Sequence, residues 1–416
     1  MRLLVYGLNY LPELTGIGKY TGEMCAWLAS RGHTVHAVCA VPYYPEWQVP
    51  KAYRRGLYRT EERDGVMVHR TRLYVPTKPT TTSRLLHLCS FAVASLPQLL
   101  RRRSVRADVL IAVEPTLFCA PAALMAARLF RAKSLLHIQD FELDAMTGLG
   151  MGRSGDFAAT IERWLMRRFD AISTISYSMI DRAREKLQGG DPPVLFFPNW
   201  VDIDFVKPGP TGDRYRERWD IPPTTKVILY SGNLGKKQGL EIVLEAAQAL
   251  QGEPDVIFLF VGAGSAVDSL KDAAEAMRLD NVRFYPLQPY EDLPELMALA
   301  DIHLVVQRRG AADVVLPSKL TTILAAGGTA VITAEPETEL GRLCTHHPGI
   351  AVRVAPEDGA LLTGALRELL DGVDVTARRA NPLARAYAEQ NLSKETVLER
   401  FEDDLRRLIG KGKQDV

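Results

Sequence analysis

The stretch Gln307–Gly328, QRRGAADVVLPSKLTTILAAGG, joins two apolar runs by a polar loop and a helical segment. His303–Val306 before it is a short apolar run typical of a buried parallel strand. Ala330–Ile332 has the same character and follows a glycine pair that ends the helical segment. Strand, helix and strand in this order predict a β-α-β unit of a parallel sheet.

The loop and helix start inside this stretch have the charge pattern of an anion-binding site. Pro317 and Ser318 suit a first helical turn, because the N–H that proline lacks would be spare there. The free amides of such a turn attract anions, and Arg308, Arg309 and Lys319 add three positive charges. We expect a phosphate group to bind here. The simpler interpretation is one more strand–loop–helix unit of an α/β domain.

Apolar runs and helical stretches alternate along the whole chain. Strands are expected at 2–8, 34–40, 66–70, 109–112, 133–137, 171–173 and 194–197, and again at 227–231, 256–262, 282–285, 303–306, 330–333 and 350–354. This alternation predicts an α/β fold with two Rossmann-like, doubly wound parallel-sheet domains that face a cleft.

The chain of 416 residues is too long for one ordinary core. We expect an N-terminal Rossmann-like domain over 1–198 and a C-terminal Rossmann-like domain over 224–390. The Pro-, Gly- and Asp-rich segment 199–223 is expected to link them. Residues 391–416 are expected to form a C-terminal helix that packs back toward the first domain.

The net charge of +1 conceals an uneven distribution. Residues 1–198 carry 26 Lys and Arg against 17 Asp and Glu, whereas the remainder carries 25 against 33. A basic first half favours an anionic partner such as a membrane surface. No zinc-finger, RRM or basic-helix pattern is present, so we do not expect nucleic acid. Five scattered cysteines and the lack of a signal peptide predict a cytoplasmic protein.

The segment Arg84–Leu100 is long and apolar and is followed by Arg101, Arg102, Arg103 and Arg106. It allows two interpretations, a buried crossover helix kinked near its proline or an interfacial helix on an anionic membrane. The second would place the protein peripherally on the inner face of the cytoplasmic membrane. No apolar run is long enough to span a bilayer.

Three clusters in the first half fall at expected strand ends, where ligands of parallel sheets bind. Gly16 and Gly18 form a first turn that permits close approach of a ligand, without the dinucleotide fingerprint. The rigid aromatic loop at 42–47 can stack on sugars or simply cover the core. The polar run 137–142 contains possible acids and bases, whose plain alternative is a capping or loop role. The residues concerned are Tyr43, Tyr44, Trp47, Gln139, Asp140 and Glu142.

The expected strand ends of the second half carry groups that suit a nucleoside diphosphate. The turn 231–239 contains Asn233, Lys237 and Gln238 and can present amides and a cation to phosphate. Gly264 permits close approach, and a base could pack near Gln288 and Tyr290. No Asp-x-Asp motif stands beside this turn, so we expect neither a metal nor another cofactor, and neutralisation falls to lysines.

With these motifs the chain resembles the retaining glycosyltransferases of the GT-B fold, family GT4, over essentially its whole length. The resemblance rests on Gly16-Ile17-Gly18, Pro198-Asn199-Trp200-Val201-Asp202 with Phe205 and Pro208, Ser231-Gly232-Asn233 with Gly239, Gly262-Ala263-Gly264, and Pro317-Ser318-Lys319 with Ala325-Ala326-Gly327. Long runs such as 6–24, 42–49, 85–95, 135–146 and 305–334 are most similar to transferases of colanic-acid biosynthesis.

The resemblance implies that the N-terminal domain over 1–198 binds the acceptor, that the C-terminal domain over 224–390 binds the nucleotide sugar, and that the residues named above have roles in both. Nucleotide-sugar binding would involve Gly16, Gly18, Asn233, Lys237, Gln238, Gly264, Gln288, Tyr290, Arg308, Ser318, Lys319, Leu320 and Thr322. Acceptor binding would involve Tyr43, Tyr44, Trp47, Gln139 and Glu142. Val314 and Thr322 occupy the places of the family's two glutamates. Asp140 and Asp313 therefore remain as the candidate catalytic carboxylates.

The implied reaction is metal-independent transfer of a sugar, with fucose from GDP-fucose as the first choice, to a lipid-linked oligosaccharide in exopolysaccharide assembly. A UDP-hexose donor is the alternative within the same class. A nucleotide-sugar 2-epimerase of the same fold is the alternative from another class of enzyme.

Overall fold

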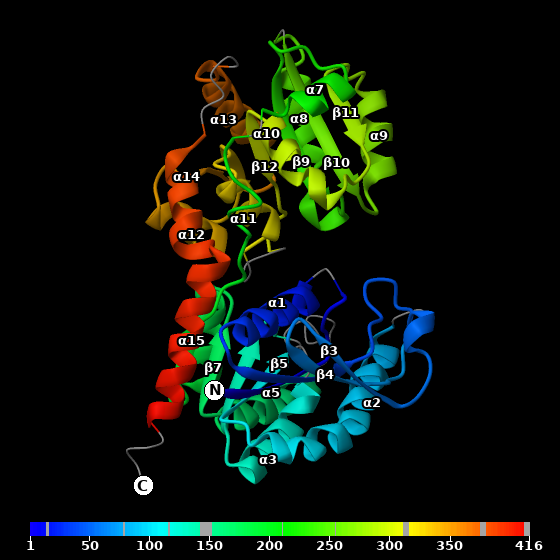
Figure 1. Cartoon of the computed structure of the whole chain (residues 1–416). Coiled ribbons are helices and arrows are strands. Elements are labelled where there is room, and N and C mark those ends of the chain that lie inside the picture. The colour runs from blue at the N-terminus through cyan, green and yellow to red at the C-terminus, as the bar shows by residue number, and fades with distance from the viewer. Residues whose placement is uncertain are drawn as a thin grey trace. The chain divides into compact units, whose positions relative to one another are not determined.

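The computed structural model describes residues 1–13, 16–77, 80–114, 117–141, 152–209, 211–253, 255–310, 316–374 and 380–411. The chain forms two compact units, which are both mixed α/β (Figure 1). The first consists of Met1–Pro198 together with Leu398–Val416, and the second of Asn199–Val397.

The first unit contains an eight-stranded sheet in the order β3-β4-β2-β1-β5-β6-β7-β8. All neighbouring strands are parallel except the pair β3 and β4. The strands are β1 (Arg2–Gly7), β2 (Thr34–Ala40), β3 (Tyr58–Arg63), β4 (Val66–Thr71), β5 (Val109–Glu114), β6 (Lys133–Ile138), β7 (Ala171–Thr174) and β8 (Val194–Phe196). Strands β1 and β5 are almost wholly buried, as expected for a parallel sheet covered on both faces.

The helices of the first unit are α1 (Gly16–Ser30), α2 (Thr81–Leu100), α3 (Ala120–Phe130), α5 (Gly152–Met166) and α6 (Tyr177–Leu187). Helices α2 and α3 contact each other and the sheet (Figure 1). Helix α15 (Lys394–Lys411) belongs to this unit from Leu398 onward. Its Phe401 ring stacks on Phe197 at 3.7 Å, and its buried Glu402 lies 2.8 Å from His33.

The second unit contains a six-stranded parallel sheet in the order β11-β10-β9-β12-β13-β14. The strands are β9 (Lys226–Asn233), β10 (Val256–Ala263), β11 (Val282–Tyr285), β12 (Ile302–Val305), β13 (Ala330–Thr333) and β14 (Val352–Val354). The helices are α7 (Asp213–Arg218), α8 (Glu241–Ala249), α9 (Val267–Ala276), α10 (Leu293–Leu299), α11 (Ser318–Ala325), α12 (Glu339–His346), α13 (Gly359–Asp371) and α14 (Pro382–Tyr387).

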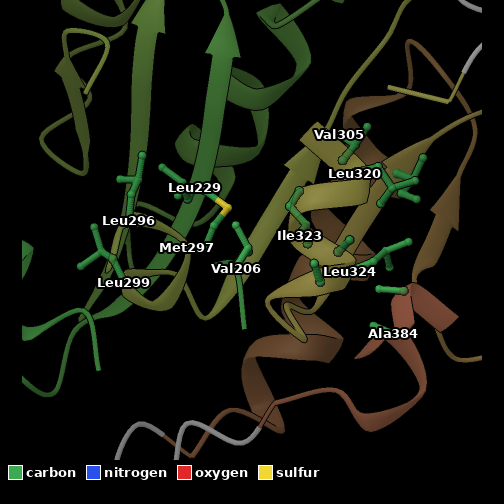
Figure 2. Packing of buried hydrophobic residues seen from close by; sticks show 14 of the residues in the cluster. Val206, Leu229, Leu296, Met297, Leu299, Val305, Leu320, Ile323, Leu324 and Ala384 are labelled. Carbon is green, nitrogen blue, oxygen red and sulfur yellow. The ribbon is translucent and has the colours of Figure 1, made fainter. Parts of the chain in front are cut away.

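Strand β9 shows how this sheet is buried on both faces. Val227 and Leu229 point into one apolar cluster, whereas Ile228 and Tyr230 point into the other. Because side chains of a strand alternate between faces, a strand covered on both sides must be apolar throughout. Helix α11 packs on the first cluster, and Figure 2 shows its side chains among Val305 of β12 and Ala384 of α14.

Every strand expected from the sequence is present, and the fold class is confirmed. Two differences concern the first unit. Gly16 and Gly18, expected to form a turn, lie in the first residues of helix α1, and β3 was not expected, because its sequence YRTEER is charged and none of its residues is buried. The segment 199–223 contributes Val206, Tyr215 and Trp219 to the core of the second unit.

Candidate functional site: a glycine turn and a buried lysine

The last residues of the paired strands β9 and β10 leave no room for side chains between their backbones. A Cβ added to Gly262 would lie 1.9 Å from the carbonyl oxygen of Gly232, and both glycines have positive φ, of +149° and +125°. A Cβ on Gly264 would lie 2.3 Å from the Leu234 oxygen and 2.7 Å from Asn233 Oδ1. Glycine is therefore required at these positions so that the turn after β9 can fold over the end of β10.

Lys319, in the first turn of α11, reaches back to this turn. A Cβ on Gly232 would lie 3.5 Å from both Cε and Nζ of Lys319, so the lysine passes beside the open face of the glycine. Its Nζ donates to the Tyr230 hydroxyl at 2.6 Å and lies 3.8 Å from the centre of the Tyr230 ring. Burial lowers the pKa of Lys319 to about 7, because low-dielectric surroundings disfavour its charged form.

Arg308 lies beside the same turn. Its backbone N–H donates to the Lys237 carbonyl at 3.2 Å, and its side chain forms an ion pair with Glu241 at 2.9 Å. A Cβ on Gly239 would lie 2.6 Å from Cγ of Arg308. Close to this contact, Oε1 of Gln238 is buried and has no hydrogen-bond partner among the described residues. The loop thus places the exposed cations of Lys237 and Arg308 beside the glycine turn.

The residues in the first turn of α11 differ in exposure. Ser318 is exposed, whereas Leu320 is fully buried and its N–H already donates to the Pro317 carbonyl. The Thr322 hydroxyl donates to the Ser318 carbonyl. Ser318 and Lys319 are consequently the residues of this turn that face away from the core.

Gln288 and Tyr290 follow β11, at the sheet edge beyond β10. The Gln288 side-chain oxygen accepts hydrogen bonds from Tyr215 and Arg218, each at 3.3 Å. Tyr290 is 55% exposed and stacks on Phe205 at 5.0 Å. The described contacts place these two residues with the 199–223 segment rather than with Lys319.

In the first unit, the aromatic loop is held by a carboxylate that sequence analysis did not single out. Glu13 is buried and accepts hydrogen bonds from the backbone amides of Tyr43 and Tyr44 at 2.9 and 3.0 Å, and from Asn9 at 2.8 Å. Burial raises the pKa of Glu13, against the effect of these bonds. A Cβ on Gly18 would lie 2.9 Å from Cβ of Glu13. A side chain at position 18 would therefore collide with Glu13 in its observed position.

The three aromatic residues of the loop differ in exposure. Tyr43 is buried, Tyr44 is 41% exposed and Trp47 is half-buried. Tyr43 and Trp47 pack around His87 of α2 at ring distances of 4.6 and 5.4 Å, and the buried Nε2 of His87 has no partner among the described residues. The loop combines a core contact with an exposed ring.

Gln139 and Asp140 follow β6. Gln139 is buried, and its Nε2 lies 3.0 Å from Nε2 of His137. His137 in turn contacts Ser173 at 2.9 Å, and burial lowers its pKa to about 3, so it is neutral. Asp140 is exposed. The other two candidate carboxylates, Glu142 and Asp313, lie outside the described residues.

The structure brings together six of the nucleotide-binding candidates, namely Asn233, Lys237, Gln238, Gly264, Arg308 and Lys319. Gly16 and Gly18 belong to the other compact unit. Tyr230 was missed, although a hydroxyl at the carboxyl end of an apolar strand was visible in the sequence. Glu13 and His87 were also missed. A single carboxylate or histidine is common in any loop or helix and does not by itself indicate a functional residue.

Among the described residues, no group of three or more His, Cys, Asp or Glu side chains is placed to hold a metal ion. An Asp-x-Asp sequence occurs at Asp202 and Asp204, where Asp202 Oδ1 accepts from the backbone amides of Asp204 and Phe205. This carboxylate closes a local turn. Within the same described ranges, every helix is too short or too polar to cross a membrane.

The fold is that of a GT-B glycosyltransferase, and the chain belongs to family GT4. The family described as Glycosyl transferase 4-like domain matches residues 15–200, and that described as Glycosyl transferases group 1 matches residues 212–374. The chain is 50% identical over 414 residues, 98% of its length and 100% of the relative, to the putative colanic acid biosynthesis glycosyl transferase WcaI of Escherichia coli K12.

More distant similarities are found in sequence and in solved structures. The chain is 27% identical over 245 residues, 59% of its length and 60% of the relative, to the probable glycosyltransferase WbjE of Pseudomonas aeruginosa. The crystal structure of Anabaena Alr3699/HepE in complex with UDP superimposes with a TM-score of 0.71 at 16% identity, over 98% of this chain and all of that one. Sucrose-phosphate synthase from Thermosynechococcus elongatus gives a TM-score of 0.71 at 14% identity, over 99% and 100%.

Proposed function

We propose that this glycosyltransferase is retaining and metal-independent, and that it transfers fucose from GDP-fucose to a hydroxyl of a lipid-linked oligosaccharide in exopolysaccharide assembly. The observation that carries the donor site is the position of Lys319, which lies across the open face of Gly232 at the end of β9. A cation beside a glycine turn and a helix start is the arrangement that binds a diphosphate.

In the proposed reaction, the acceptor oxygen forms a bond to the anomeric carbon while the bond from that carbon to the diphosphate breaks. The acceptor proton passes to the departing phosphate on the same face of the sugar. Lys319 and the first amides of α11 neutralise the charge that develops on the leaving group, which is the main catalytic contribution in such a site. This scheme requires no protein nucleophile.

GDP-fucose is the donor implied by the resemblance to transferases of colanic-acid biosynthesis, and the relative with 50% identity is named for that process. A UDP-hexose donor is the second candidate, because the HepE structures contain UDP and UDP-glucose. Thermal unfolding with GDP or UDP separates them, since a ligand that binds the native state raises the melting temperature. We expect GDP to give the larger shift and labelled fucose to enter the lipid fraction. A shift with UDP alone would favour the hexose donor, and no shift with either would contradict the donor site.

Transfer is expected to continue at an undiminished rate in excess EDTA. Lysine and helix-start amides neutralise the diphosphate in the proposed site, so a chelator removes nothing that the reaction needs. The measurement is initial rate against EDTA concentration. Loss of activity that Mn²⁺ or Mg²⁺ restores would overturn the metal-free mechanism.

We also propose that α2 attaches the protein to the inner face of the cytoplasmic membrane. Its Leu86 and Val93 are 56% and 74% exposed and lie seven residues apart, on one stripe of the helix. Arg101 and Arg103 directly after α2 are exposed as well. Exposed apolar side chains beside cations are typical of helices that lie in the interface of an anionic bilayer.

The variant Arg101→Ser/Arg103→Ser is expected to bind anionic vesicles more weakly, by about 2 kcal/mol or roughly thirtyfold. Arg102 is left intact because its guanidinium contacts His69 at 3.3 Å. The measurement is co-sedimentation with phosphatidylcholine vesicles with and without phosphatidylglycerol. The matched control, Arg184→Ser/Lys271→Ser, removes two exposed charges from α6 and α9. Equal sedimentation with both vesicles, or none with either, would contradict the attachment.

A further inference from the structure

Lys319 is held in an unusual environment for a lysine. It is half-buried, and in the described part of the chain the Tyr230 hydroxyl is the one hydrogen-bond acceptor for its Nζ. An ammonium group has three N–H donors, so most of its capacity is left for a ligand. The Tyr230 ring, 3.8 Å from Nζ to its centre, stabilises a cation through its negative face.

Packing holds the ring of Tyr230, and a hydrogen bond holds its hydroxyl. It is fully buried in β9 and packs near Phe260 at 6.3 Å. Its hydroxyl donates to the Asn233 carbonyl at 2.8 Å, and the adjoining Leu234 amide donates to the Ala263 carbonyl at 2.9 Å. The peptide between Asn233 and Leu234 is therefore fully paired, and its carbonyl is kept away from a bound anion.

We propose that Tyr230 is a positioning residue of the donor site, which holds the Lys319 ammonium beside Gly232 and fixes the glycine turn through Asn233. This inference rests on the proposed function, because it assumes that a nucleotide-sugar diphosphate binds at this turn. One hydroxyl then joins two parts of the site that lie 89 residues apart. A phenylalanine in its place keeps the ring but loses both hydrogen bonds.

The other two cations near this turn are held differently from Lys319. Arg308 is paired with Glu241, and Lys237 is exposed. Burial is the cause that lowers the pKa of Lys319, to about 7. Because the ammonium form of Lys319 binds the diphosphate, the affinity for the nucleotide sugar is highest below that pKa. It falls as the pH rises through the pKa. The lost acceptor in Tyr230→Phe disfavours the ammonium, so the midpoint of this fall moves to lower pH.

The test is calorimetric titration of GDP-fucose and UDP-glucose between pH 6 and 9. A nucleotide sugar is used because the terminal phosphate of a free diphosphate also titrates near neutral pH. We expect Tyr230→Phe to bind about tenfold more weakly at pH 8 and to show the shifted midpoint. In a Lys319→Met background, Tyr230→Phe is expected to weaken binding less than in the unaltered protein, because only the contribution through Asn233 remains.

Tyr6→Phe is the matched control, because it removes a buried hydroxyl bonded to Ser95 at 2.7 Å in the other unit. It is expected to leave the titration unchanged. If the unaltered protein binds neither nucleotide sugar, the proposed donor site fails. If it binds one and Tyr230→Phe leaves affinity and midpoint unchanged, or weakens binding equally without Lys319, the positioning role is wrong and the donor site stands.

Discussion

Lys319→Met is expected to weaken nucleoside-diphosphate binding by about 1–3 kcal/mol and to lower kcat by roughly a hundredfold or more. The side chain passes beside Gly232, and its ammonium donates to the Tyr230 hydroxyl. Methionine keeps the apolar stem and removes the charge, so the loss reports electrostatics rather than packing. The effect on kcat is expected because charge on the leaving diphosphate grows toward the transition state.

Calorimetry and steady-state kinetics measure these two effects. Lys271→Met is the matched control, since it removes an exposed lysine from α9 in the same unit. The control is expected to change affinity by less than twofold. Unaltered affinity and kcat in Lys319→Met would remove this residue from the donor site.

Gly262→Ala is expected to destabilise the protein by about 2–6 kcal/mol and to abolish nucleotide binding. The new Cβ would meet the Gly232 carbonyl oxygen at 1.9 Å, and the φ of +149° is strained for any residue with a side chain. Overpacking and backbone strain each cost about 1–3 kcal/mol. The contact is between backbones of paired strands, so no side-chain movement can relieve it.

Chemical denaturation of the two variants measures this cost. Gly364→Ala is the matched control, because it lies in the interior of α13 and a Cβ there would meet nothing within 4 Å. A glycine-to-alanine change in such a helix is expected to stabilise by about 0.5–1 kcal/mol. Equal stability of Gly262→Ala and the unaltered protein would mean that β9 and β10 do not approach as described.

The parallel strands could be predicted because burial on both faces forces a continuous apolar run. Val227–Tyr230 illustrates this, since successive residues enter two different clusters. The charged edge strand β3 could not be predicted in the same way. Its sequence has no apolar face of its own, and it forms because β4 offers a free edge in antiparallel register.

The candidate donor site could be predicted as a set of strand ends, because parallel topology brings those ends to one edge. The particular contacts could not. The bond between Lys319 and Tyr230 depends on where α11 begins and how its side chain turns back. Gln288 also looked available in the sequence, but Tyr215 and Arg218 already bind its oxygen. Side-chain pairing of this kind is decided by packing, which no local pattern reveals.

The central proposal is transfer of a sugar from a nucleotide donor to a lipid-linked acceptor. Its most direct test is the release of nucleoside diphosphate from GDP-fucose, measured as purified lipid-linked oligosaccharide is added. We predict negligible release without acceptor and a rate that rises with acceptor to saturation, with the label recovered in the lipid. Conversion of the nucleotide sugar to an epimer or to a free glycal without acceptor, or release that does not depend on the lipid, would contradict it.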